Sequence, residues 1–265
     1  MNDTPDHKER AHSTLGASSA YRWIACPGSV AAIAALPPEQ RNKSSVYAKE
    51  GTTAHELGEV CLRTGKDAIE FAGRFIGGSY APGGPRSLGG GEEVSGDMAE
   101  AVQVYLDYAR SITDADQDVI MIEQRFDLSG LNPPPGCDMF GTSDLAVYKR
   151  ATRRLHVVDY KHGQGVAVEA VGNPQLRYYA LGALLVLPPD CIVDDVEISV
   201  VQPRAPHAAG PIRSEIVGAF DLIEWSADLM TAAARTLDPS APLEAGEHCR
   251  FCPAAATCPA LSSRA

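Results

Sequence analysis

The chain has 265 residues and a formal net charge of −11, and its composition, 45% hydrophobic and 22% charged, is ordinary for a soluble globular protein. No run of apolar residues approaches the roughly 18 that a membrane span needs, and the polar N-terminus lacks the apolar core of a signal peptide. We therefore expect a cytoplasmic protein that does not enter membranes. Because of this negative charge, we do not expect the whole surface to bind a polyanion, so any nucleic-acid contact should be local.

The N-terminal third is predicted to contain short helices and one long loop. Residues 1–12 are expected to be disordered, and "SSAYRWIACPGSVAAIAAL" predicts a short helix that is broken at Pro27 and then resumed. Helical periodicity runs from Ser44 to Arg63. Nine glycines then fall within residues 72–96, a density that predicts a long mobile loop.

Beyond this loop the sequence predicts alternating helices and strands. A helix over Met98–Ser111 is followed by a strand, "VIMIEQRFDL", by the turn "NPPPG", and by two strands that the basic hairpin "KRATRR" joins. The remaining segments are a helix, "NPQLRYYALGALLVL", two strands, "VDDVEISVVQPR" and "PIRSEIV", and a helix over Ala219–Leu237. This order predicts a single α/β or α+β domain over residues 13–265 with a mixed sheet.

Three charged residues, Asp144, Asp159 and Lys161, lie within strand segments that otherwise read as buried. Because hairpin strands pair antiparallel, the two carboxylates can lie close across the sheet. The simplest interpretation is a half-buried salt bridge between Asp159 and Lys161, which share a strand face. The alternative is a hard cation such as Mg²⁺ shared by the carboxylates, with the lysine beside it. These are the parts needed to hydrolyse a phosphodiester.

The pattern "GTSD" followed by "VVDYK" resembles the core of the RecB-like branch of the PD-(D/E)XK nucleases. This resemblance implies an α/β, restriction-endonuclease-like core with a mixed central sheet flanked by helices. It also implies Asp144 and Asp159 as ligands of Mg²⁺ or Mn²⁺, and Lys161 as the catalytic lysine.

Two further segments resemble motifs of the same branch. "EGTTAHELGE" resembles its helix motif and implies His55 as a metal ligand, and "QLRYYALGA" resembles the motif after the lysine and implies site roles for Gln175 and Tyr179. Taken alone, a histidine such as His55 is more often a capping or surface residue, while Gln175 and Tyr179 share a helix face at a spacing of four. We interpret three nearby acidic residues as solvated or supporting side chains and do not predict them as ligands: Glu56, Glu59 and Glu123.

Three of the seven cysteines fall within ten residues, in "EHCRFCPAAATCPAL". Disulfides are not expected in a reducing compartment, and a zinc site needs a fourth ligand, for which His248 is available. Iron–sulfur members of the same nuclease branch resemble this pattern, with one upstream cysteine in a context like "SAYRWIACPGS". The resemblance implies a 4Fe–4S cluster that joins the N- and C-terminal segments, with zinc as the alternative metal, on these ligands: Cys26, Cys249, Cys252 and Cys258.

The resemblance implies a Mg²⁺- or Mn²⁺-dependent DNA exonuclease of phage or bacterial recombination and repair, working with a single-strand-binding or annealing protein. The alternative is a non-catalytic DNA-binding or scaffolding protein that keeps the nuclease fold. Six basic residues between Lys149 and Arg177 form a local excess of positive charge, which we expect beside the site, where it would contact DNA phosphates. For Arg150 to Arg154, a solvated hairpin is an equal alternative.

Overall fold

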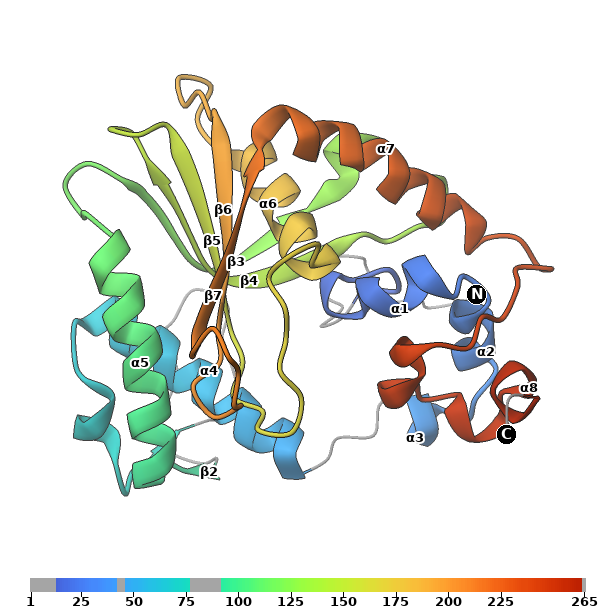
Figure 1. The fold of residues 1–265 in the computed structure, drawn as a ribbon, viewed down its shortest axis with the longest axis horizontal. Helices are drawn as coiled ribbons and strands as arrows, with labels where there is room; N and C mark the ends of the chain where they lie inside the picture. The colour runs from blue at the N-terminus through green and yellow to red at the C-terminus, as the bar shows by residue number, and fades with distance from the viewer. Residues whose placement is uncertain (1–12, 42–45, 77–91, 264–265) are drawn as a thin grey trace, which may run out of the picture.

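A computed structural model describes residues 13–41, 46–76 and 92–263 of the chain. The predicted disorder of residues 1–12 and most of the glycine-rich loop lie outside these residues. A five-stranded mixed sheet with the order β3-β4-β5-β6-β7 occupies the centre of the molecule (Figure 1). Its strands are β3 (Val119–Asp127), β4 (Phe140–Lys149), β5 (Arg154–Tyr160), β6 (Asp195–Val201) and β7 (Ile212–Gly218).

Neighbouring strands pair antiparallel except β5 and β6, which are parallel. A parallel pair needs a long crossover, and helix α6 (Pro174–Val186) provides it. The helix begins where the sequence predicts, because the Asn173 side chain accepts hydrogen bonds from the backbone N–H groups of Gln175 and Leu176, and Pro174 occupies the first helical turn.

Helices cover both faces of the sheet, so its central strands are buried on both sides. One hydrophobic cluster joins the sheet to α6, α7 (Ala219–Arg235) and α1 (Ala20–Ala25). A second cluster joins the other face to α4 (Val46–Thr64) and α5 (Gly96–Ile112), as Figure 1 shows. The predicted mixed sheet flanked by helices is therefore confirmed. No helix in the described ranges is long and apolar enough to cross a membrane.

The two ends of the predicted glycine-rich loop are more ordered than expected. Strands β1 (Phe75–Ile76) and β2 (Glu92–Glu93) pair antiparallel, so the expectation of one irregular loop over residues 72–96 is wrong at its ends. Val94 and Ile76 are buried against the α4–α5 layer. The burial of these apolar side chains stabilises the two strands although glycines surround them in the sequence. The short 3₁₀ helix η3 (Ala68–Phe71) completes this half, while η4 (Leu128–Leu131) packs on the side of α6.

The N-terminal segment forms η2 (Ala17–Ser19) and α1, breaks at Pro27 as predicted, and continues as α2 (Ser29–Ala34) and α3 (Pro38–Arg41). It packs beside the C-terminal segment, which contains η5 (Glu247–Phe251), η6 (Ala255–Thr257) and α8 (Pro259–Ser262) (Figure 1). The Gly28 N–H donates to the Pro242 carbonyl at 3.0 Å, so backbone contacts already join these distant parts of the chain.

The contact between α6 and β3 yields a stability prediction. A Cβ at Gly182 would lie 2.3 Å from Phe126 Cβ, whereas one at Gly51 in α4 would meet no atom within 4 Å. We expect Gly182→Ala to lower the free energy of unfolding by about 1–3 kcal/mol through overpacking. Gly51→Ala should raise it by up to about 1 kcal/mol through helix propensity. Urea denaturation measures both, and a Gly182→Ala variant as stable as wild type would contradict this packing.

Candidate active site

Three acidic residues form a row across three adjacent strands. The β3–β4 ladder keeps one register on both sides of Glu123, which places Glu123 opposite Asp144. The β4–β5 ladder begins with Leu145 opposite Val158, and one further step places Asp144 beside Asp159. The register of the sheet therefore brings together carboxylates that are far apart in sequence.

The backbone of β3 changes direction at this row. Glu123 has a φ of 47°, in the left-handed region that non-glycine residues seldom adopt. Before it, Ile120 and Ile122 pack against the α4–α5 layer, and after it, Phe126 and Leu128 pack against the α6–α7 layer. Even-numbered side chains thus point to the α4–α5 layer before Glu123 and to the α6–α7 layer after it. Backbone strain of this kind gathers at functional sites.

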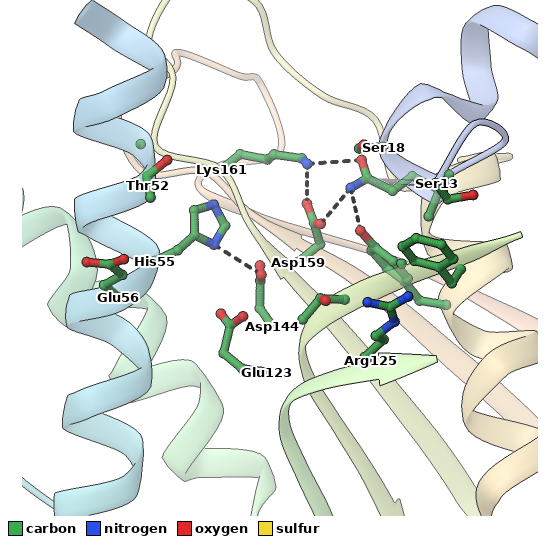
Figure 2. Close-up of a pocket in the computed structure, with 18 of the residues that line it drawn as sticks. Ser13, Ser18, Thr52, His55, Glu56, Glu123, Arg125, Asp144, Asp159 and Lys161 are labelled. Carbon is green, nitrogen blue, oxygen red and sulfur yellow. Dashed lines mark hydrogen bonds and ion pairs between the residues drawn. The ribbon is translucent and has the colours of Figure 1, made fainter. Parts of the chain in front are cut away.

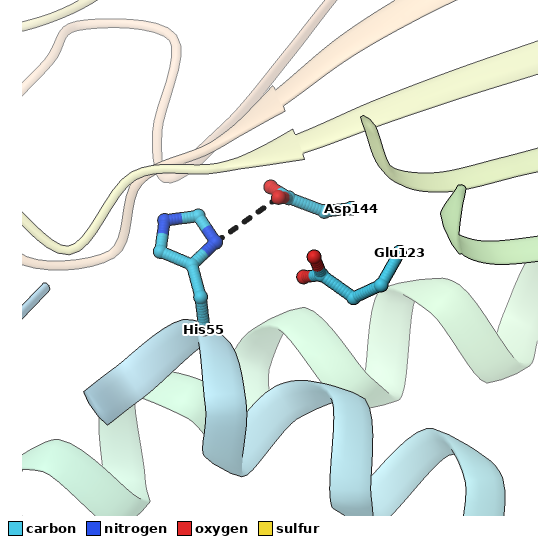
Figure 3. Close-up of side chains that lie close together, drawn as sticks. All are labelled: His55, Glu123 and Asp144. Carbon is cyan, nitrogen blue, oxygen red and sulfur yellow. Dashed lines mark hydrogen bonds and ion pairs between the residues drawn. The ribbon is translucent and has the colours of Figure 1, made fainter. Parts of the chain in front are cut away.

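His55 approaches the row from α4. Its Nδ1–H donates to Asp144 Oδ1 at 3.0 Å, and potential ligand atoms of His55, Glu123 and Asp144 all lie within 4.8 Å of one another (Figure 3). Two carboxylates and one imidazole suit a divalent cation such as Mn²⁺, and the carboxylate oxygens suit Mg²⁺. We had not predicted Glu123 as a ligand, and its position in this group makes it a candidate. The available signal was an acidic residue within an apolar strand, as at Asp144.

All six residues predicted for the site line one cavity of about 540 Å³: His55, Asp144, Asp159, Lys161, Gln175 and Tyr179. Figure 2 shows Thr52 and His55 on α4 on one side of this candidate catalytic cavity, with Asp159 and Lys161 across from them. Arg125 also lines it, and its guanidinium stacks 3.7 Å from the centre of the Phe140 ring. The structure brings these residues together, while their chemical roles stay predictions.

Lys161, Asp159 and Gln175 form a connected polar group. Lys161 Nζ lies 2.8 Å from Asp159 Oδ2 and donates to Gln175 Oε1 at 3.0 Å. Gln175 Nε2 in turn lies 3.2 Å from both Asp159 Oδ1 and the Tyr179 hydroxyl oxygen. The salt bridge expected from the D-x-K spacing is present, with the Asp159 side chain 3% exposed and the Lys161 side chain 25% exposed. Gln175 therefore orients both charged groups.

The buried charges shift one another's protonation. Burial opposes the charged form of His55, but Asp144, Asp159 and Glu123 more than offset it and raise its pKa to about 9. Burial also opposes ionisation of Asp144, yet the His55 charge and the Tyr160 N–H, 2.7 Å from Oδ2, leave its pKa lowered. The pKa of Asp159 is raised, mainly by burial, against the effect of Lys161. His55 is thus protonated at neutral pH and must lose that proton to bind a cation.

A hydrogen-bonded network behind His55 was not predicted. Tyr160 packs its ring edgewise on the His55 ring, 5.5 Å between centres, and its hydroxyl donates to His162 Nδ1 at 2.8 Å. Buried His162 donates from Nε2 to Glu50 Oε1 at 3.1 Å, and Arg204 Nη1 donates to the same oxygen at 2.7 Å. This network anchors α4 to the ends of β5 and β6. It joins residues about 40 to 150 positions apart, so the local sequence carries no signal of it.

The basic hairpin lies away from the site, which corrects our expectation. It joins the ends of β4 and β5 opposite to those that carry the carboxylates. Its arginines are paired with acidic residues at 2.5–2.8 Å, in the pairs Arg150–Asp190, Arg153–Asp194 and Arg154–Asp195. The charge of the hairpin arginines is therefore neutralised, and of the six basic residues only Lys161 lines the candidate catalytic cavity.

The four cysteines predicted as cluster ligands come from the two packed ends of the chain. Cys26 is buried, and its Sγ accepts the Glu244 N–H at 3.3 Å, while Cys249 Sγ accepts the Gly246 N–H at 3.4 Å. Burial lowers the pKa of Arg22, against the effect of Cys252 and Cys26. His248 donates from Nε2 to the Glu244 carbonyl at 2.8 Å, so this nitrogen is engaged elsewhere.

Fold and site define an α/β protein with a mixed central sheet and a candidate divalent-cation centre between helix α4 and the middle of strands β3 and β4. A family model described as "Protein of unknown function (DUF2800)" matches residues 12–265. The chain belongs to this family.

The ligand group predicts cation binding without nucleic acid. We expect Glu123→Gln and Asp144→Asn each to weaken Mn²⁺ binding at least about tenfold, because each removes one charged ligand. Glu56→Gln is the matched control, since Glu56 lines the same cavity outside the ligand group. Free Mn²⁺ is measured by electron paramagnetic resonance, and folding by thermal unfolding. Unchanged Mn²⁺ affinity in folded Glu123→Gln and Asp144→Asn variants would rule out this centre.

Proposed function

We propose that this protein is a metal-dependent deoxyribonuclease with a RecB-like, restriction-endonuclease-like core, acting as an exonuclease in phage or bacterial recombination and repair. The observation that carries the proposal is the convergence of Asp144, Asp159 and Lys161 in one cavity, with His55 and Glu123 beside them. The order of the motifs along the chain supports the family and the DNA substrate. The geometry supports the reaction class.

The residues present fit a divalent cation. Its ligands would be His55, Glu123 and Asp144, with Asp159 at the edge of the group. When bound, the cation would lower the pKa of a coordinated water and offset the charge of the phosphodiester. Buried carboxylates in a row repel one another, so a cation at this place also removes a folding cost.

Lys161 is placed to neutralise a phosphoryl oxygen. Asp159 and Gln175 hold its ammonium group at the cavity wall, where a quarter of the side chain stays exposed. Hydrolysis forms a bond from a water oxygen to phosphorus and breaks the bond to the leaving oxygen, which takes up a proton. Because such transfer depends on position and charge, the role of this group is to orient the phosphate and stabilise the transition state.

A non-catalytic DNA-binding or scaffolding protein is the alternative. Such a protein has no need of a buried acidic pair with an exposed lysine, because ion pairs of this kind add little to stability when their desolvation is counted. The paired arginines of the hairpin also leave no evident positive surface there for duplex DNA. The catalytic proposal therefore accounts for more of the described residues.

Nuclease activity is tested with end-labelled linear DNA and Mg²⁺ or Mn²⁺. We expect Lys161→Met to slow hydrolysis by about 10²- to 10³-fold, because a charge that stabilises the transition state is lost. Its Mn²⁺ affinity should stay unchanged, and Lys66→Met on the surface should match wild type in both measurements. Asp159→Asn should also lose hydrolysis. The nuclease proposal would be contradicted if wild type showed no metal-dependent degradation, or if Lys161→Met kept full activity.

We also propose that Cys26, Cys249, Cys252 and Cys258 bind a 4Fe–4S cluster. Support comes from the N–H groups directed at Cys26 and Cys249, since hydrogen bonds to sulfur tune such clusters. Zinc on the same four sulfurs is the alternative.

Anaerobically purified protein should be brown, with broad absorption near about 400 nm. Cys26→Ser should lose this absorption as fully as Cys252→Ser, although the two residues lie at opposite ends of the chain. Cys191→Ser is the control, because Cys191 lies outside the proposed ligand set. Iron and zinc analysis completes the measurement, and colourless wild-type protein with one equivalent of zinc would favour zinc instead.

A further inference from the structure

A second cavity, of about 970 Å³, opens beside the catalytic cavity. Its walls are η2 and α1, the segment of residues 166–175 that leads into α6, and the cysteine-bearing turn of residues 246–251. Four residues line both cavities: Ala17, Ser18, Lys161 and Gln175. The two cavities therefore form one continuous groove, in which Lys161 stands at the junction.

The wall formed by the cysteine-bearing turn and α1 presents aromatic side chains to solvent. Phe251 is 76% exposed between Cys249 and Cys252, and Tyr21 on α1 is 54% exposed. The Tyr21 ring meets His248 edgewise, with 6.3 Å between ring centres, so its position is defined. An apolar ring as exposed as Phe251 gains free energy by stacking on a ligand.

The charge of this second cavity is nearly balanced. Three cationic side chains line it, Arg22, Lys161 and Arg250, and two acidic ones, Glu169 and Glu247. Duplex DNA presents mainly phosphates to a protein surface, and its bases are stacked on one another inside the helix. Exposed rings suit bases that are already unstacked, and the slight cationic excess of the wall suits the phosphates of a single strand.

We propose that the second cavity binds the unstacked bases of a single-stranded nucleic acid, with Phe251 and Tyr21 as stacking surfaces. The backbone of that strand then continues past Lys161 into the catalytic cavity. The inference rests on the proposed function for its choice of ligand. It assigns the cysteine-bearing segment a part in substrate binding in addition to joining the chain ends.

The test measures binding of a labelled oligothymidylate of about 12 nucleotides by fluorescence anisotropy. EDTA is present so that no cleavage occurs. Phe251→Ala should weaken binding about five- to hundredfold, the range for loss of one base stack, and Phe251→Trp should restore it. Phe220→Ala is the matched control, because Phe220 is 69% exposed on the remote helix α7. With at most three phosphate contacts, the slope of log affinity against log salt should be no steeper than about −2.

Several outcomes would overturn the inference: no binding of the oligonucleotide by wild type, equal binding by Phe251→Ala, or equal competition by a blunt duplex. Hydrolysis of bis(4-nitrophenyl) phosphate by wild type and Lys161→Met tests the proposed chemistry separately, because this small diester needs no stacked base. Failure of that reaction with Phe251-dependent binding intact removes the nuclease proposal alone. Working hydrolysis with unchanged binding in Phe251→Ala removes the stacking site alone.

Discussion

Three carboxylates in one row across β3, β4 and β5 cannot all be ionised in a buried place without positive charge beside them. In this protein the positive charge comes from Lys161 at Asp159 and from protonated His55 at Asp144. A divalent cation can take the place of the His55 proton, because the same atoms that hold the proton can hold the metal. The charges of this row are therefore compatible with a bound cation, as the proposed function requires.

This charge balance depends on two helices that pack on opposite faces of the sheet. Helix α4 carries His55 and is anchored by the pairing of Glu50 with His162 and Arg204. Helix α6 carries Gln175, which orients Lys161. Both helices reach the same cavity, which Glu123 in the middle of β3 also lines. The site is therefore a product of tertiary packing more than of any one segment.

The ends of the chain contribute to the same region. The N-terminal helix α1 and the cysteine-bearing turn lie together and form a wall of the groove that leads to Lys161. A metal cluster on the four cysteines would fix this wall, because it would hold two segments that few backbone contacts join. The cysteine-bearing turn would then both support the structure and bind substrate. This double role would account for the exposed ring of Phe251 next to the cysteines.

Periodicity and capping residues alone determined the helices around Asn173 and over Ala219–Arg235, the strands of the sheet, and the unusual placement of Asp144, Asp159 and Lys161 within apolar strands. These signals are local, since side-chain alternation and caps act within a few residues. Only the tertiary structure decided that Glu123 joins the carboxylate row, because an acidic residue within an apolar strand does not reveal the register in which that strand pairs. The tertiary structure also decided that the arginines of the basic hairpin pair with acidic residues some 40 positions away. Ion pairs between segments depend on how the chain folds back on itself, which the local sequence does not specify.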